Sequence, residues 1–353
     1  FLITGMFLEI ISIGLIIPVI SILSNESFYD NYFQYLPFLV EYSHTEKINF
    51  TLIVLCFVFF LKFCFSLLLN YQQFRYSMQL QSNISKELIS KYLLMPYEKY
   101  FKLKSSEVLR NVMIDTNRFI SGVMLPIIYL ASEFLIIFGI SLILITQIGL
   151  SSLSIIFVFA LFGTIYVAFS KKTIKRLGNS RSTIDENIIK FSSEALKGIR
   201  EIKLNEVEKY FLTFFRSTFD KNAKIMSNFF TFQAAPRLGV EVILVFFLAI
   251  TMFIFVLKDF ETSKIITTLG LFTVAAIRLI PSVNKIITSQ QNIRFNHIAM
   301  NTIIHDLKEN KNRIYDNKDL VKFNDTIEIK NLNFFYDKNK QVLNDISLNI
   351  SKG

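Results

Sequence analysis

The sequence predicts an all-α polytopic membrane protein with six transmembrane helices, followed by the first β-strands of another domain. Of its 353 residues 52% are hydrophobic, and the mean hydropathy is +0.43, which is more apolar than a soluble domain of this length. Several stretches hold about 20 apolar residues with few charges, the length that a helix needs to cross the hydrocarbon layer of a bilayer. Polar segments with helical periodicity separate these stretches.

The apolar stretches are placed by hydropathy. The predicted spans cover residues 1–23, 49–70, 119–147, 150–170, 236–257 and 263–284. Long polar connections join the second span to the third, from Tyr71 to Arg118, and the fourth to the fifth, from Lys171 to Ala235. Both connections continue the helical periodicity of the spans, and Pro96 breaks the first. We therefore expect two helical hairpins that project well beyond the membrane.

The charge distribution predicts the orientation of these helices. The net charge is +10, but Lys and Arg gather in the polar connections, as in cytoplasmic loops of membrane proteins, which argues against a nucleic-acid partner. By the positive-inside rule both hairpins and both termini are cytoplasmic, and residues 24–47 and 258–264 lie outside.

No catalytic or metal-binding pattern stands out in the sequence. The histidines lack metal-ligand spacing, and no Ser–His–Asp arrangement is evident. Cys56 and Cys64 fall within one span, where we expect them to be small core residues. The histidines are His44, His297 and His305. We expect neither a metal site nor a catalytic residue in this chain.

The pattern changes after Asn324. Residues 326–331 and 342–350 alternate as strands do, and residues 337–340 between them have the composition of a turn. The sequence therefore predicts a membrane domain over residues 1–315, and a linker with the start of a β-containing domain over residues 316–353.

Six spans with long intracellular hairpins, followed by IEIKNLNFFYDKNKQVLNDISLNISKG, resemble the six-helix ABC exporter subunit that runs into its nucleotide-binding domain. The resemblance implies an ATP-driven translocase with ATP and Mg²⁺ as cofactors, working as a homodimer or a paired half-transporter. The phosphate-binding G-x-x-x-x-G-K-[ST] loop should follow Gly353, so we expect a chain truncated before it, unable to hydrolyse ATP alone. An ion channel or membrane sensor also fits six spans, but explains neither the hairpins nor the strands.

Three further segments resemble functional parts of such exporters. Tyr336 matches the aromatic residue that stacks on adenine, although local sequence alone favours an ordinary strand residue. Segments within MPYEKYFKLKSSEVLRNVMIDTNRF and GIREIKLNEVEKYFLTFF resemble the coupling helices, which dock on nucleotide-binding domains. The predicted coupling residues are Tyr97, Glu98, Lys99, Tyr100 and Phe101, and, around residues 205–211, Asn205, Glu206 and Glu208.

Within the exporters, the chain is most similar to bacterial lipid-linked oligosaccharide flippases that serve protein glycosylation. The similarity rests on FLEIISIGLIIPVI, APRLGVEV, AAIRLIPSVNKI and an aromatic-rich outer loop. It implies a polyprenyl-pyrophosphate oligosaccharide as cargo, moved outward across a bacterial inner membrane; a lipid, multidrug or peptide exporter of the same fold is the alternative. In the outer loop, Phe28, Tyr32 and Phe33 would meet the lipid tail, or the loop is simply anchored in the interface.

Charged residues within the spans are candidates for cargo binding. A charge at the bilayer centre costs about 2.5–3.5 kcal/mol on insertion scales, so it is expected to face the protein interior or a wet cavity. Guanidinium groups bind phosphate oxygens in a planar fork, and Arg237 and Arg278 therefore suit a pyrophosphate. The flippases carry cavity arginines on their second, fifth and sixth helices, and the resemblance adds Arg75 as the candidate on the second.

The same charges could instead neutralise one another. Glu241 follows Arg237 by four residues, on the same face of a helix. Lys62 is expected to pair with Glu9 or Glu133, which also lie in apolar spans. For Lys62 we favour this structural role.

Overall fold

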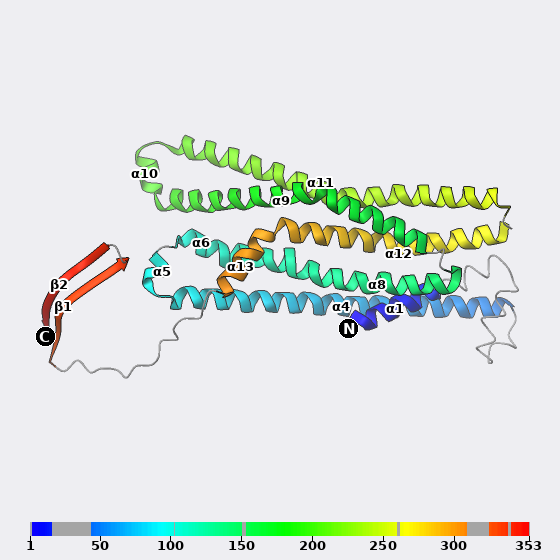
Figure 1. Cartoon of the computed structure of the whole chain (residues 1–353), viewed down its shortest axis with the longest axis horizontal. Helices are drawn as coiled ribbons and strands as arrows, with labels where there is room; N and C mark the ends of the chain where they lie inside the picture. Colours follow the sequence, from blue (N-terminus) through cyan, green and yellow to red (C-terminus); the bar gives the residue numbers. More distant parts are fainter. Residues whose placement is uncertain are drawn as a thin grey trace.

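The computed structural model of the chain describes residues 2–15, 44–101, 103–149, 153–259, 262–308, 325–337 and 340–352. Long helices lie side by side along the long axis of the molecule (Figure 1). Within the described residues, five helices are long and apolar enough to cross a membrane, and α1 is a shorter apolar helix. The predicted helical membrane fold is confirmed. The end of the first span and the outer-loop residues Phe28, Tyr32 and Phe33 lie outside the described residues.

The elements follow one another along the chain as shown in Figure 1. They are α1 (Leu2–Gly14), α4 (His44–Leu94), α5 (Tyr97–Phe101), α6 (Ser105–Leu109), the π-helix η2 (Arg110–Asp115), α7 (Thr116–Phe119), the π-helix η3 (Ile120–Met124), α8 (Leu125–Ile148), α9 (Leu153–Lys197), α10 (Ile199–Leu204), α11 (Glu208–Leu257), α12 (Thr262–Phe295), α13 (His297–Lys308), β1 (Thr326–Asp337) and β2 (Lys340–Ser351).

Three of the membrane helices extend far beyond a bilayer. Helix α4 has 51 residues, α9 has 45 and α11 has 50, whereas about 20 suffice to cross the hydrocarbon layer. At 1.5 Å per residue, α4 is about 77 Å long. The two predicted hairpins are therefore present. One has α5 at its tip, directly after the predicted break at Pro96, and the other has α10.

The tip of the second hairpin differs in position from the predicted segment at residues 205–211. The short helix there is α10, which ends at Leu204, and α11 already begins at Glu208. Gly198 ends α9, because glycine weakens a helix interior. The side-chain amide of Asn205 donates to the Glu201 carbonyl at 2.7 Å, and Glu206 adopts a φ of 56°, so the chain reverses between these helices.

Within the described part of the chain, three clusters of buried hydrophobic residues hold the helices together. One lies between α8, α9, α11 and α12, and a second lies between α4, the π-helical region and α13. In the third, the rings of Phe229 and Phe295 stack with centroids 3.8 Å apart and join α11 to α12. Consequently α12 and its continuation α13 contact both hairpins.

The apolar parts of α4 and α11 remain largely uncovered by the rest of the chain. Phe60 on α4 is 61% exposed and Phe253 on α11 is 63% exposed, as expected for surfaces that face lipid. Cys56 and Cys64 are also exposed. The expectation that they are core residues was wrong, because both lie on the outward face of α4.

After α13, β1 and β2 form an antiparallel two-stranded sheet with Thr326 opposite Ser351. The two predicted strands are thus confirmed. The register shifts between Ile329 and Leu332, where Asn331 has a φ of 52°. Tyr336 lies in β1, but its side chain is outside the described part of the structure.

Two glycines of α9 allow a test of the packing between α9 and α12. A Cβ at Gly178 would overlap the backbone carbonyl of Phe295, whereas a Cβ at Gly163 would make ordinary contacts with Ile287 and Val283 at 3.7–3.9 Å. Overpacking costs about 1–3 kcal/mol, while alanine favours a helix by about 1 kcal/mol. We expect Gly178→Ala to lower the thermal midpoint in detergent, followed by circular dichroism, and Gly163→Ala to leave it equal or higher. Equal midpoints would contradict the close approach.

Candidate functional site

A buried carboxylate lies at membrane depth between three helices. The side chain of Glu9 on α1 is 8% exposed. Lys62 of α4 donates a hydrogen bond from Nζ to Glu9 Oε1 at 2.9 Å. Arg278 Nε on α12 lies 2.5 Å from the same oxygen. The expected pairing of Lys62 is therefore present, and Arg278, a predicted cavity residue, shares its carboxylate.

These three side chains do not balance in charge. One carboxylate faces two cations, so the group keeps one excess positive charge, and Lys62 and Arg278 are 23% and 29% exposed. Ion pairing in the apolar layer lowers the cost of both cations. An excess charge in a poorly polarisable environment attracts an anion more strongly than it would in water. We call Glu9, Lys62 and Arg278 the Glu9 cluster.

A second buried carboxylate at membrane depth is balanced. Glu133 of α8 is 5% exposed, and its Oε1 lies 3.1 Å from Lys285 Nζ on α12. The ammonium group also sits 4.2 Å from the ring centroid of Tyr129, which favours its positive charge. Sequence reasoning missed Lys285, which falls one residue beyond the last predicted span. A search for the partner of Glu133 would have found it.

The other two candidate arginines take no part in the ion pairs of the Glu9 cluster. Arg237 Nε pairs with Glu241 Oε1 at 3.1 Å along α11, with 71% of the arginine side chain exposed. Arg75 is exposed on α4, and within the described residues it has no ion-pair partner. It follows Lys62 by 13 residues, which places it about 20 Å further along the helix. The described structure therefore does not gather Arg75, Arg237 and Arg278 into one site.

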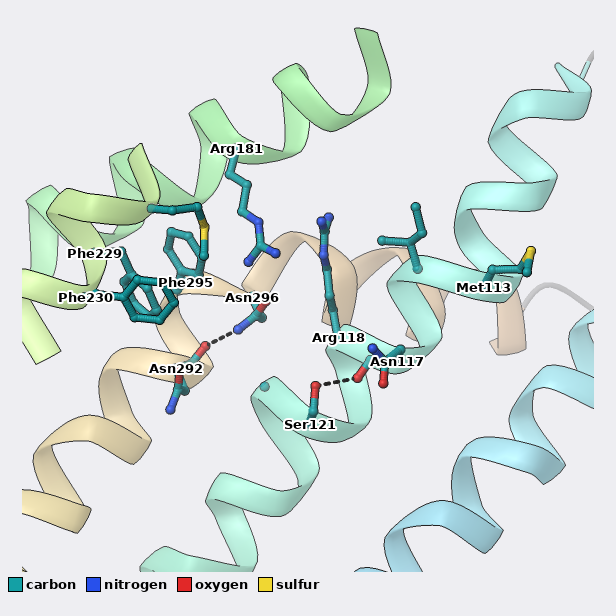
Figure 2. A pocket seen from close by; sticks show the side chains of 13 residues that line it. Met113, Asn117, Arg118, Ser121, Arg181, Phe229, Phe230, Asn292, Phe295 and Asn296 are labelled. Carbon is teal, nitrogen blue, oxygen red and sulfur yellow. Dashed lines mark hydrogen bonds between the residues drawn. The ribbon is translucent and has the colours of Figure 1, made fainter. Parts of the chain in front are cut away.

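A pocket of about 400 Å³ lies beyond the apolar spans, at the bases of the hairpins. Figure 2 shows the guanidinium groups of Arg118 and Arg181 extending toward it, opposite the aromatic rings of Phe229 and Phe295. Amide groups of Asn292 and other asparagines border the same space. The pocket therefore combines an aromatic wall with polar donors from α7, α9 and α12.

Carboxylates compensate the arginines around this pocket. Arg118 Nη2 lies 2.7 Å from Asp185 Oδ2, and Arg181 Nε is 3.6 Å from the same oxygen. Arg110 pairs with Asp115 at 3.2 Å and with Glu186 at 3.4 Å. Three arginines thus meet three carboxylates. The network joins the first hairpin to α9 and leaves little net charge for an anion.

Helix α13 is fixed to the first hairpin by another polar group that sequence reasoning missed. Tyr92 donates from its hydroxyl to Asp306 Oδ2 at 2.5 Å, and the Asn111 amide donates to the same oxygen at 3.1 Å. Lys91 donates to the backbone carbonyl of Asp306. These residues come from α4, η2 and α13, so the segment that follows the last span is anchored to the first hairpin.

The predicted coupling residues lie at the tips of the hairpins. On α5, Tyr97 and Phe101 are 67% and 74% exposed, and their ring centroids are 6.0 Å apart. Tyr100 is 39% exposed, while the side chains of Glu98 and Lys99 are outside the described residues. The helix spans the same residues as the predicted coupling helix, but its docking on a partner stays a prediction. At the other tip, Glu208 pairs with Lys203 at 2.9 Å.

Replacing Glu9 tests the role of the Glu9 cluster in stability. Glu9→Gln leaves Lys62 and Arg278 without their carboxylate, and losing one partner of a buried ion pair costs about 3–5 kcal/mol. The matched change Glu241→Gln breaks an exposed pair worth about 0–1 kcal/mol. We expect a much lower thermal midpoint for Glu9→Gln than for Glu241→Gln, measured in the same detergent. Similar midpoints for the two variants would show that Glu9 is not a structural anchor.

Comparisons with known proteins agree with this architecture. The family model described as ABC transporter transmembrane region matches residues 2–278. The structure is also similar to that of a bacterial Atm1-family ABC exporter with ATP bound, at a TM-score of 0.72 and 12% sequence identity. The match covers 99% of this chain and 61% of that exporter, so the chain spans less than two thirds of its length. At this identity the likeness concerns the fold alone. The family match, over most of the chain, shows that it is a multi-pass membrane protein and belongs to the ABC transporter transmembrane region family.

Proposed function

We propose that this chain is the membrane-spanning part of an ATP-driven exporter that moves a lipid-linked anion, a polyprenyl-pyrophosphate oligosaccharide, across a bacterial inner membrane. The excess positive charge of the Glu9 cluster is the observation that carries the proposal. A neutral drug would not compensate an unbalanced cation at membrane depth, where each unpaired charge raises the free energy of the protein. A pyrophosphate would supply the missing negative charge, and guanidinium binds its oxygens in a planar fork.

The proposed transport cycle is driven by nucleotide-binding domains in the cytoplasm. Both termini and both hairpins would be cytoplasmic, and the chain would work as a homodimer or a paired half-transporter. The tips at α5 and α10 would contact nucleotide-binding domains, which supply ATP hydrolysis with Mg²⁺. Residues 316–353 would begin such a domain, and Tyr336 would stack on adenine there. The aromatic residues Phe334 and Phe335 beside it are 42% and 48% exposed, which suits a strand that meets a planar ligand.

The hairpins are suited to pass motion from the nucleotide-binding domains to the membrane. The ion-pair network joins the first hairpin to α9, hydrogen bonds join α13 to the first hairpin, and the stacked rings of Phe229 and Phe295 join α11 to α12. The bases of both hairpins would therefore move together with α12. Because α12 carries Arg278, a displacement at the tips would reposition the Glu9 cluster. Cargo could bias this change only by binding one state more tightly than the other.

A lipid, multidrug or peptide exporter of the same fold is the second candidate. The separation of Arg75 and Arg237 from Arg278 favours it, because a doubly charged pyrophosphate would be expected to engage more than one arginine. A cargo with a single negative charge fits the single excess charge of the Glu9 cluster equally well.

Stimulation of ATP hydrolysis by cargo tests the proposed identity of the cargo. In liposomes, a polyprenyl-pyrophosphate oligosaccharide should stimulate hydrolysis by the full-length protein, and Arg278→Ala should abolish the stimulation while basal hydrolysis continues. Glu9 keeps Lys62 as a partner in this variant, so the fold should survive. Arg176→Ala, an exposed cytoplasmic arginine, is the control and should respond as the parent does. Stimulation that survives Arg278→Ala would return Arg278 to a structural role, and no stimulation of the parent would favour the second candidate.

The tip of the first hairpin gives a test of coupling. Phe101→Ser removes an exposed aromatic ring from α5 and should reduce stimulated hydrolysis several-fold without changing the thermal midpoint, because interface aromatics contribute disproportionately to docking. Ile89→Ser on α4, which also removes an exposed apolar side chain, serves as the control. If both variants keep full stimulation, α5 is not a coupling helix.

A further inference from the structure

An apolar groove lies between α8, α9 and α12, separate from the Glu9 cluster. Its volume is about 440 Å³, within the range of about 300–1,000 Å³ that ligand pockets usually have. Phe134, Ile156, Phe159 and Val283 are among the apolar residues that line it. Phe134, at its edge, is 60% exposed, so the groove opens on the outer surface of the helices at membrane depth.

The groove has the length of one membrane leaflet together with its interface. Its lining extends from Ile156 to Lys171 on α9 and from Leu279 to Arg294 on α12. Each stretch advances by 15 residues, or about 22 Å along its helix. The hydrocarbon of one leaflet is about 15 Å thick, half of the bilayer core. Lys171 directly follows the predicted span over residues 150–170, so the polar end of the groove lies near the membrane surface on the side of the hairpins.

The polar end is positively charged. Lys171, Gln290 and Arg294 line it, and no Asp or Glu is among the lining residues of the described structure. Arg294 donates from Nη1 to the Val167 carbonyl at 3.0 Å, which holds its guanidinium at the mouth of the groove. Lys171 is exposed and has no ion-pair partner among the described residues. Two cations at the end of an apolar groove match an anionic head group attached to a hydrocarbon chain.

We propose that this groove binds an anionic phospholipid of the cytoplasmic leaflet, with one acyl chain along α9 and α12 and its phosphate between Lys171 and Arg294. Basic pockets between transmembrane helices on the cytoplasmic side are known to select anionic head groups. The bound chain contacts α8, α9 and α12 together, so the lipid stabilises the packing of α12 against the second hairpin. The site does not depend on the identity of the cargo.

Photolabelling in nanodiscs tests the site. The full-length protein is reconstituted in phosphatidylcholine with phosphatidylglycerol that carries a photoactivatable group on one acyl chain, and labelled peptides are mapped by mass spectrometry. We expect labels at residues 156–171 and 279–294. Lys171→Gln should reduce this labelling about fivefold, since a basic residue near an anionic surface contributes about that factor. Lys172→Gln, the neighbouring exposed lysine outside the groove, should not.

A second pair of variants tests the apolar part of the groove. Ala160→Phe places a ring in the groove and should abolish the labelling, whereas Leu161→Phe, on the adjacent face of α9, should leave it unchanged. An equivalent phosphatidylcholine probe should label weakly and respond to neither lysine variant. Labelling that is equal for the two lipids, or unaffected by Lys171→Gln and Ala160→Phe, would overturn the proposal. Two further results would also overturn it. If stoichiometric polyprenyl pyrophosphate displaced the lipid probe, the groove would be a cargo site. If Ala160→Cys formed a disulfide between two copies of the chain, the groove would be a subunit contact.

Discussion

The apolar layer of the membrane allows neither an unpaired backbone group nor an isolated charge, and most of this structure follows from that constraint. The backbone meets it with uninterrupted helices, which continue outward as the hairpins. The side chains meet it by pairing across helices: Glu9 with Lys62 and Arg278, and Glu133 with Lys285. Both groups include a cation from α12. This helix is consequently bound to α1 and α8 by ion pairs, and Lys62 of α4 shares the carboxylate of α1.

The same helix, α12, also connects the membrane-spanning region to the hairpins. At its end Phe295 stacks on Phe229, and the backbone of Phe295 approaches Gly178 of α9 too closely for any side chain there. Beyond it, α13 is held to the first hairpin through Asp306. Movements of either hairpin tip should therefore reach α12, and through it Arg278. In this account the charged residues at membrane depth serve the fold, and their one excess charge serves the cargo.

Sequence patterns predicted those features that depend on local chemistry. Hydropathy located the spans, and Pro96 marked the break before α5, because a proline interrupts a helix wherever it lies. Features that depend on distant contacts could not be read from the sequence. Hydropathy and spacing could not choose Glu9 as the partner of Arg278, because the two residues are more than 260 positions apart in the chain. The expectation that Cys56 is a core residue was wrong, since the packing of α4 leaves this side chain exposed. The position of α10 depends on Gly198 and the Asn205 cap, whose effects compete within a few residues. The apolar groove between α8, α9 and α12 arises only once these three helices are assembled.

Alternating access of the Glu9 cluster is the most direct test of this account. Arg278→Cys, in a protein whose native Cys56 and Cys64 are replaced, is exposed to a membrane-impermeant maleimide on either side of sealed vesicles. We expect reaction from the cytoplasmic side without nucleotide, and from the outer side when a non-hydrolysable ATP analogue and Mg²⁺ are bound. Reaction from one side only under both conditions, or from neither, would show that the cluster does not lie on a transport pathway.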